Sequence, residues 1–179
     1  HQYHGIALAR QKNLPEAICA LKQAQTLAPN SSDIRSNLAQ VYLAQGSLSL
    51  AIREGEAAIE FNPQNVSALR VLADAHLLAG DAKRAQELLK EVLAFLPDDP
   101  IVHHRLGVAS RAQHRVSEAM AHFEQALEKN PKLIEPLDQI VAILVSENKV
   151  PQARERVERE VAMNPQDPRF LNLLGRVLV

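Results

Sequence analysis

The sequence predicts an all-α solenoid of antiparallel helix pairs, because one pattern of residues recurs at a fixed interval along the chain. Proline stands every 34 residues, at Pro29, Pro63, Pro97, Pro131 and Pro165. Alanine and other small residues recur in step with these prolines. A fixed interval over 179 residues indicates one supersecondary unit that is repeated, so we expect a single elongated array over residues 1–179 without one compact central core.

Each spaced proline can be taken as position 32 of a 34-residue unit. The expected units are residues 1–31 (partial), 32–65, 66–99, 100–133, 134–167 and 168–179 (partial). Position 20 is alanine wherever it can be read, at Ala17, Ala51, Ala85, Ala119 and Ala153. Position 8 is small in most units, at Gly5, Ala39, Ala73, Gly107 and Gly175, with Val141 as the exception. Since helices approach closely only where side chains are small, these two positions predict the contact within each helix pair.

The same frame predicts the helices. First helices are expected near residues 1–11, 32–45, 66–79, 100–113, 134–147 and 168–178, and second helices near 14–28, 48–62, 82–96, 116–130 and 150–164. A left-handed residue should end each first helix at position 15, which holds Lys12, Gly46, Gly80, His114 and Asn148. The remaining prolines fit helix starts, where no amide donor is lost: Pro15 and Pro151 open second helices, and Pro100, Pro136 and Pro168 lie in first turns of first helices.

The joint phasing of alanine, small residues and proline resembles the tetratricopeptide repeat family over essentially the whole chain. The chain departs from that family at position 4, which never holds Trp, and at position 11, where only Tyr42 keeps an aromatic ring. The resemblance implies a right-handed superhelix with its concave face lined by first helices. The departures suggest an array of the bacterial type, packed through alanine and leucine.

Composition and motifs argue against several functions. A net charge of −1, without a basic stripe or stacking aromatic residues, predicts no nucleic-acid partner. The sequence lacks a glycine-rich phosphate loop and the HExxH, GxSxG and CxxC motifs, so we expect no enzyme, no catalytic residue and no cofactor. The seven histidines include no i,i+4 pair, so no metal site is expected. No apolar stretch is long enough for direct membrane insertion.

The lone cysteine and the chain ends bear on the cellular context. Cys19 lies among apolar residues and is expected to be a buried structural thiol. One cysteine suits the cytoplasm or the bacterial periplasm equally well, so localisation stays open. The chain starts at His1 and, judged by the period, begins inside one repeat and stops inside another, which indicates a fragment of a longer protein.

The resemblance implies that a partner binds in the concave groove formed by first helices. The residues expected to line that groove are Asn37, Gln40, Arg70, Asp74, His104, Arg105, Arg111 and Asp138. The unit 100–133 holds five Lys or Arg against three Asp or Glu, so an acidic partner segment could lie over Arg70, His104, Arg105 and Arg111. Binding there would weaken with salt and strengthen below about pH 6.5, as histidines protonate. Alternatively, these are ordinary solvated faces, with Arg105 and Arg111 paired to Asp74 or Asp138.

The predicted function is a non-catalytic scaffold that binds a peptide or protein segment in the groove. Family analogy places similar arrays in bacterial secretion, export and envelope assemblies. Capture of a heat-shock chaperone's acidic tail is not expected, because only Asn37 matches the family's carboxylate clamp. Two alternatives stay open: a regulatory arm of a larger enzyme, and an array that self-associates through its last helix, where Leu171, Leu174 and Leu178 should be partly bare.

Two residues break the repeat pattern. Gly55 replaces the large residue usual at position 24, so we expect a void there unless another helix fills the space. Glu160 stands where alanine is usual at position 27, beside the last helix, and is expected to loosen that junction.

Overall fold

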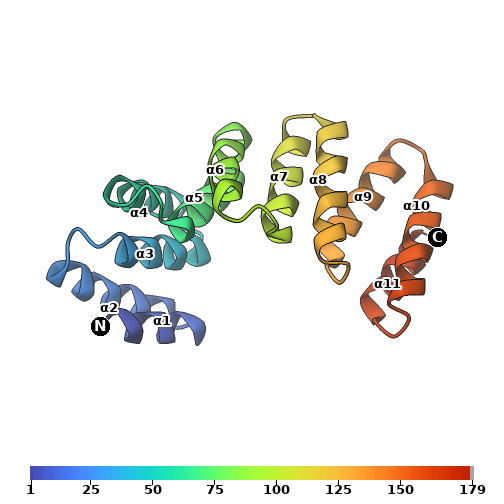
Figure 1. Cartoon of the computed structure of the whole chain (residues 1–179). Helices are drawn as coiled ribbons and strands as arrows, with labels where there is room; N and C mark the ends of the chain where they lie inside the picture. The colour runs from blue at the N-terminus through green and yellow to red at the C-terminus, as the bar shows by residue number, and fades with distance from the viewer. Residues whose placement is uncertain (178–179) are drawn as a thin grey trace. The chain divides into compact units, whose positions relative to one another are not determined.

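The computed structural model describes residues 1–177, which form helices joined by short turns (Figure 1). Within this range the helices are α1 (Gln2–Arg10), α2 (Leu14–Leu27), α3 (Ser32–Gln45), α4 (Leu48–Phe61), α5 (Val66–Leu78), α6 (Ala82–Phe95), α7 (Pro100–Ala112), α8 (Val116–Lys129), α9 (Ile134–Ser146), α10 (Val150–Met163) and α11 (Pro168–Val177). These bounds lie close to the predicted ones, and the predicted all-α class of helix pairs is confirmed.

The chain divides into two compact units, His1–Phe95 and Leu96–Val179. In unit 1, which holds α1–α6, every helix packs against the next, and the first helices α3 and α5 also lie side by side. In unit 2, which holds α7–α11, successive helices pack in the same way and α9 also contacts α11. Packing between neighbours is what the 34-residue period predicts, while the single continuous array remains a prediction.

The predicted left-handed residue ends each first helix that is followed by a second helix. The φ angles are 62° at Lys12, 81° at Gly46, 84° at Gly80, and 59° at both His114 and Asn148. The next amide then bonds to the carbonyl five residues back, as Ser47 N does to Tyr42 O at 2.9 Å. This bond satisfies a helix-end carbonyl, which explains why the turn recurs with three different non-glycine residues.

The predicted close contact at position 8 is present in both units. A Cβ atom added at Gly107 would lie within 2.9 Å of three ring carbons of Phe123, and one added at Gly5 would lie within 3.0 Å of two Leu21 atoms. The position-24 residues Leu21 and Phe123 therefore cover the position-8 glycines. Ala17 and Ala119, at position 20, are fully buried, and the Ala17 carbonyl oxygen lies 3.2 Å from the Cβ position of Gly5.

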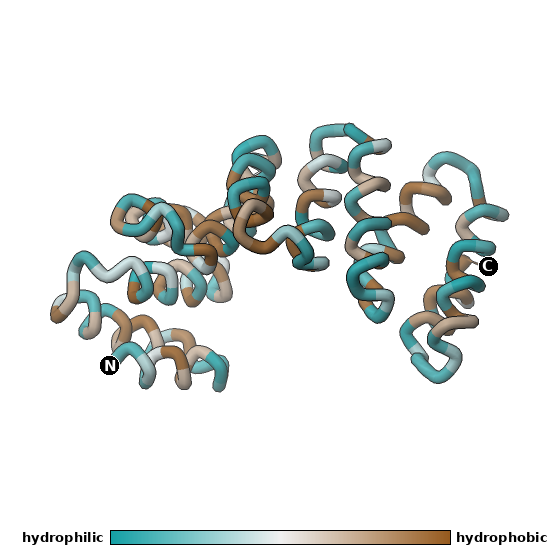
Figure 2. The backbone as a smooth tube through the Cα atoms, viewed as in Figure 1, coloured by the Kyte–Doolittle hydropathy of each residue, from teal (hydrophilic) through white to brown (hydrophobic). Residues whose placement is uncertain are grey.

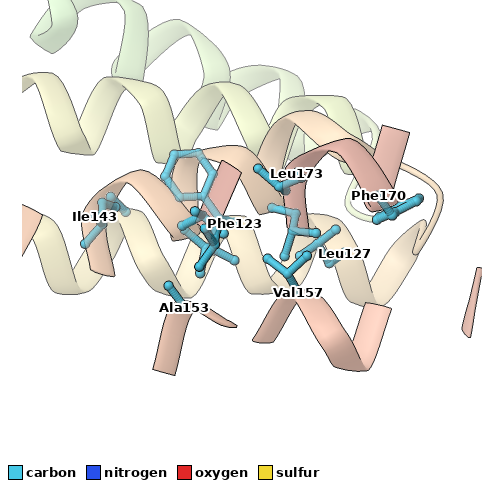
Figure 3. Close-up of a cluster of buried hydrophobic side chains, with 12 residues drawn as sticks. Phe123, Leu127, Ile143, Ala153, Val157, Phe170 and Leu173 are labelled. Carbon is cyan, nitrogen blue, oxygen red and sulfur yellow. The ribbon is translucent and has the colours of Figure 1, made fainter. Parts of the chain in front are cut away.

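Each unit has its own buried apolar cluster. In unit 1 the cluster is built chiefly from α2 and α3, with Leu21, Leu38 and Tyr42 at its centre. In unit 2 it draws on α8, α9, α10 and α11, and Figure 3 shows Phe123 and Phe170 within it. Figure 2 shows that hydrophobic and hydrophilic residues alternate along the helices, as expected for helices with one buried face. The clusters explain how an aromatic-poor chain buries enough surface to fold.

Position 4, which lacks the family's Trp, has a different role at two sites. Arg35 donates from Nη2 to the carbonyl oxygen of Pro29 at 3.0 Å, and His103 Nε2 lies 3.3 Å from the carbonyl oxygen of Pro97. The Arg35 guanidinium also lies 5.2 Å from the ring centre of Phe61. A polar side chain at position 4 thus ties the start of its helix to the spaced proline before it.

Two expectations about exposure had different outcomes. Cys19 is exposed, so the expected buried thiol was wrong. The core face of α2 is taken by Ala17, Ala20 and Leu21, and residue 19 points away from it. In α11, Leu171 is exposed and Leu174 is half-buried, as expected, whereas Leu178 lies outside the described residues.

The space beside Gly55 is filled by a neighbouring helix. A Cβ atom at Gly55 would lie 3.2 Å from Leu72 Cδ1 and 3.3 Å from Leu72 Cβ, both on α5. Gly55→Leu should therefore lower the free energy of unfolding by about 1–3 kcal/mol, because the larger side chain must displace the fully buried Leu72. Urea unfolding followed by circular dichroism measures this change. Glu56→Leu, on the exposed side of the same helix, is the control; a stabilised Gly55→Leu variant would mean that a void exists after all.

Candidate functional site

All eight predicted groove residues lie on first helices, and four fall in each unit. In unit 1, α3 carries Asn37 and Gln40 and α5 carries Arg70 and Asp74. In unit 2, α7 carries His104, Arg105 and Arg111, and α9 carries Asp138. Gln40 and Arg111 are exposed and the other six are half-buried.

The hollow in unit 1 lies between α1, α2 and α3 and has a volume of about 420 Å³. We call it the unit 1 hollow. Three of its lining residues are polar, namely Arg10, Asn37 and Gln40. The other six are apolar: Ile6, Ala9, Leu14, Leu21, Val41 and Ala44. It therefore contains two of the predicted groove residues, on a floor that reaches the fully buried Leu21.

The three polar side chains of the unit 1 hollow are available to a ligand as far as residues 1–177 show. Within the described residues, Arg10, Asn37 and Gln40 make no side-chain hydrogen bond or ion pair. Arg10 lies in the last turn of α1, where a cation interacts favourably with the helix dipole. The hollow thus combines an apolar floor with hydrogen-bonding groups that can serve a ligand.

A second hollow, of about 360 Å³, lies in unit 2. We call it the unit 2 hollow; its lining comes from α7, α9 and α11 and comprises His104, Ile134, Glu135, Asp138, Gln139, Arg169, Asn172, Leu173 and Arg176. Much of its polar lining is already paired. Arg176 Nη1 lies 2.8 Å from Asp138 Oδ1, Arg169 Nη2 lies 2.7 Å from Asp167 Oδ2, and Arg111 donates to Gln139.

His104 resists protonation. Burial lowers its pKa below the ordinary value of 6.5; the Glu135 carboxylate acts in the opposite direction, and Arg105 adds to the lowering. The centre of the His104 ring lies 5.7 Å from the centre of the Phe123 ring. The buried Nδ1 atom of His104 has no hydrogen-bond partner within the described residues. For His104, the expected onset of stronger binding near pH 6.5 therefore shifts to lower pH.

The arginines of the predicted basic patch are engaged within the protein. Arg111 donates to the side-chain oxygen of Gln139, and Arg70 and Arg105 both take part in interactions. Asp138, considered as a partner for Arg105 or Arg111, pairs with Arg176. Arg70 lies in unit 1, whereas His104, Arg105 and Arg111 lie in unit 2.

Sequence reasoning missed Arg10 in the unit 1 hollow and Arg169, Asn172 and Arg176 in the unit 2 hollow. All four lie in the two partial units at the chain ends. Asn172 and Arg176 hold positions 5 and 9 of the repeat, which predicted residues also hold, whereas Arg10 and Arg169 hold positions 13 and 2, which none of the eight does. Reading positions 5 and 9 in the last unit would have found Asn172 and Arg176.

Neither a metal-binding cluster nor a membrane-spanning helix is found among residues 1–177. Across residues 1–177, no three His, Cys, Asp or Glu side chains are grouped so that they could hold a metal ion. Over that same stretch, no helix has the length and apolar character needed to span a membrane.

The chain is a helical-repeat protein. Its paired helices pack closely at small residues, and its first helices carry polar side chains and hollows. The chain belongs to the tetratricopeptide repeat family, because sequence models of this repeat match residues 4–66, 48–106 and 110–177. Repeats of this family generally mediate protein–protein interactions, and such scaffolds are typically non-catalytic.

Two similar proteins are longer than this chain. The human "Antiviral innate immune response effector IFIT1" is 26% identical over 191 residues, which cover 92% of this chain and 39% of that protein. The bovine "BBSome complex member BBS4" is 26% identical over 152 residues, which cover 78% of this chain and 29% of that protein. The chain therefore spans well under half the length of either relative.

Two solved structures share the fold. MamA from Desulfovibrio magneticus RS-1 has a TM-score of 0.84 at 17% identity, covering 93% of this chain and 94% of that one. The pilF protein of Pseudomonas aeruginosa has a TM-score of 0.82 at 22% identity, and the match covers 98% of this chain and 80% of that one. At these identities the likeness extends to the fold alone.

Proposed function

We propose that this chain is a non-catalytic binding module that holds a peptide or protein segment against its first helices. The observation that carries the proposal is that each unit has a hollow on this face. Four of the eight residues predicted from the sequence line these hollows: Asn37 and Gln40 in unit 1, and His104 and Asp138 in unit 2. Hollows that mix apolar and polar groups suit the side chains and backbone of a bound segment.

The family supports the same direction, since its repeats generally mediate protein–protein interactions. The bacterial secretion, export or envelope setting stays a prediction from the sequence. An acidic partner also stays a prediction. The pairing of Asp138, Arg169 and Arg176 within unit 2 makes that hollow less able to select a charge than the sequence suggested.

Site-specific photo-crosslinking tests which face binds. The crosslinking residue p-benzoylphenylalanine replaces Gln40 or Asn172, which are exposed on first helices, and in matched controls it replaces Gln23 or Gln125, which are exposed on second helices. We expect a partner from lysate to be crosslinked from Gln40 or Asn172 and not from the controls. Crosslinks from the second-helix positions alone would contradict the proposal.

Self-association through α11 is the second candidate, and one observation favours it. Leu171 is 46% exposed, and a Cβ atom added at Gly175 would meet nothing within 4 Å, so this side of α11 can accept another helix. In the same experiment, crosslinks between two copies of the chain would favour this function. A mass that rises with concentration in light scattering would support it independently.

A further inference from the structure

We propose that the unit 1 hollow takes a large apolar side chain of the partner together with a carboxylate that lies next to it. This inference rests on the proposed function and specifies the chemistry of the ligand. The apolar side chain would occupy the floor, the carboxylate would pair with Arg10, and the amides of Asn37 and Gln40 would bond to the ligand's backbone.

The floor of the unit 1 hollow can take an aliphatic side chain. Two thirds of the lining residues are apolar, and they come from three helices that enclose the space: Ile6 and Ala9 from α1, Leu14 and Leu21 from α2, and Val41 and Ala44 from α3. A volume of about 420 Å³ falls within the range of small-ligand sites. An apolar anchor in a desolvated pocket is the usual centre of binding energy at an interface.

The rim determines the charge of the ligand. Of the nine residues that line the hollow, Arg10 carries the charge. Within residues 1–177, its side chain forms no ion pair and no hydrogen bond. An anionic group of the ligand therefore gains an interaction there without breaking one in the protein. Asn37 and Gln40 each offer an amide donor and an acceptor, which match the two groups of a peptide bond.

The unit 2 hollow differs in this respect. There, Asp138 is paired with Arg176, Arg169 with Asp167, and Gln139 accepts from Arg111. A ligand must compete with those partners before it gains an interaction. Because Arg10, Asn37 and Gln40 have no such partners within residues 1–177, the unit 1 hollow is the better site for a specific contact.

Three small probes separate the side chain from the charge. N-acetyl-L-leucine carries both features, N-acetyl-L-leucinamide lacks the carboxylate, and N-acetylglycine lacks the side chain. Each is titrated into the ¹⁵N-labelled chain and followed by two-dimensional NMR. We expect N-acetyl-L-leucine to shift amides around the hollow with a Kd on the order of millimolar. The leucinamide should bind about two- to fivefold more weakly, as for one exposed ion pair, and N-acetylglycine should give no saturable shift.

Two variants assign these effects to the hollow. Arg10→Gln should abolish the difference between the acid and the amide, whereas Lys22→Gln, which removes an exposed charge from α2, should leave it unchanged. Ala9→Leu should occupy part of the apolar floor and eliminate binding of N-acetyl-L-leucine and N-acetyl-L-leucinamide. If Ala9→Leu fails to fold, as its spectrum would reveal, Arg10→Gln still decides the outcome, because Arg10 is exposed.

Other results would overturn the inference. They are the absence of saturable shifts around the hollow at tens of millimolar N-acetyl-L-leucine, equal affinities for the acid and the amide, or shifts with N-acetylglycine that match those with the leucine probe. Failure here with continued crosslinking from Gln40 would reject the ligand chemistry and leave the proposed function standing. Crosslinking from second-helix positions alone would reject the proposed function itself.

Discussion

Replacing Phe123 with alanine should lower the free energy of unfolding by about 3–5 kcal/mol. The Phe123 ring is fully buried, lies in the cluster that joins α8 to α11 and covers Gly107 on α7 (Figure 3). Alanine would leave a cavity bordered by several helices, because glycine at position 107 has no side chain to fill the space. Urea unfolding followed by circular dichroism measures the loss.

Phe95→Ala is the matched control for this prediction. Phe95 ends α6 and is 46% exposed, so its removal should cost much less than that of Phe123. Equal losses for the two variants would show that Phe123 is not the centre of the unit 2 core.

Arg156→Leu should have a comparably large effect, about 3–5 kcal/mol, because it leaves a buried carboxylate without its cation. The Arg156 side chain is 13% exposed and that of Glu160 only 4% exposed, and the two form an ion pair on α10. Arg156 Nη2 also lies 2.9 Å from Glu124 Oε2 on α8. Burial acts to lower the pKa of Arg156, but its hydrogen bonds to Glu124 and Glu160 outweigh this effect and raise the pKa above the ordinary value, so the residue stays charged.

A second substitution tests whether the buried charge is the cause. In the Arg156→Leu background, Glu160→Ala should recover much of the loss, because it removes the uncompensated carboxylate and restores the residue usual at position 27. Arg154→Leu is the control, since Arg154 forms the same i,i+4 pair with Glu158 on the exposed side of the helix and should cost about 0.5 kcal/mol or less. No recovery in the double variant would mean that lost packing of the Arg156 stem dominates.

The helix pairs were predictable because their causes are local and repeated. The left-handed residue at position 15, seen from Lys12 to Asn148, and the small residue at position 8 each have a direct backbone or steric reason. These reasons act between residues close in sequence, and the 34-residue period states them several times. The departures at Gly55 and Glu160 were also visible, although their consequences were not.

The helices that carry the predicted groove residues could be read from the sequence, but the pairing of those residues could not. The repeat frame assigns Asn37, Gln40, His104 and Asp138 to first helices, and these residues line the two hollows. It cannot say that Asp138 is occupied by Arg176, 38 residues away, whereas Arg10 has no such partner within the described residues. Pairing depends on side-chain reach across neighbouring helices, which the period does not encode.

The sequence by itself determined the fold class, the helix bounds and the face that carries the polar residues, because those follow from spacing and backbone geometry. Only the tertiary structure decided that Leu72 fills the space beside Gly55, that Arg156 accompanies the buried Glu160 and that Cys19 faces outward. It alone showed that, within residues 1–177, the three polar side chains of the unit 1 hollow form no pair, whereas Asp138, Gln139, Arg169 and Arg176 of the unit 2 hollow do. Each of these outcomes depends on which side chains of adjacent helices meet, and contacts of that kind form only when the chain is packed.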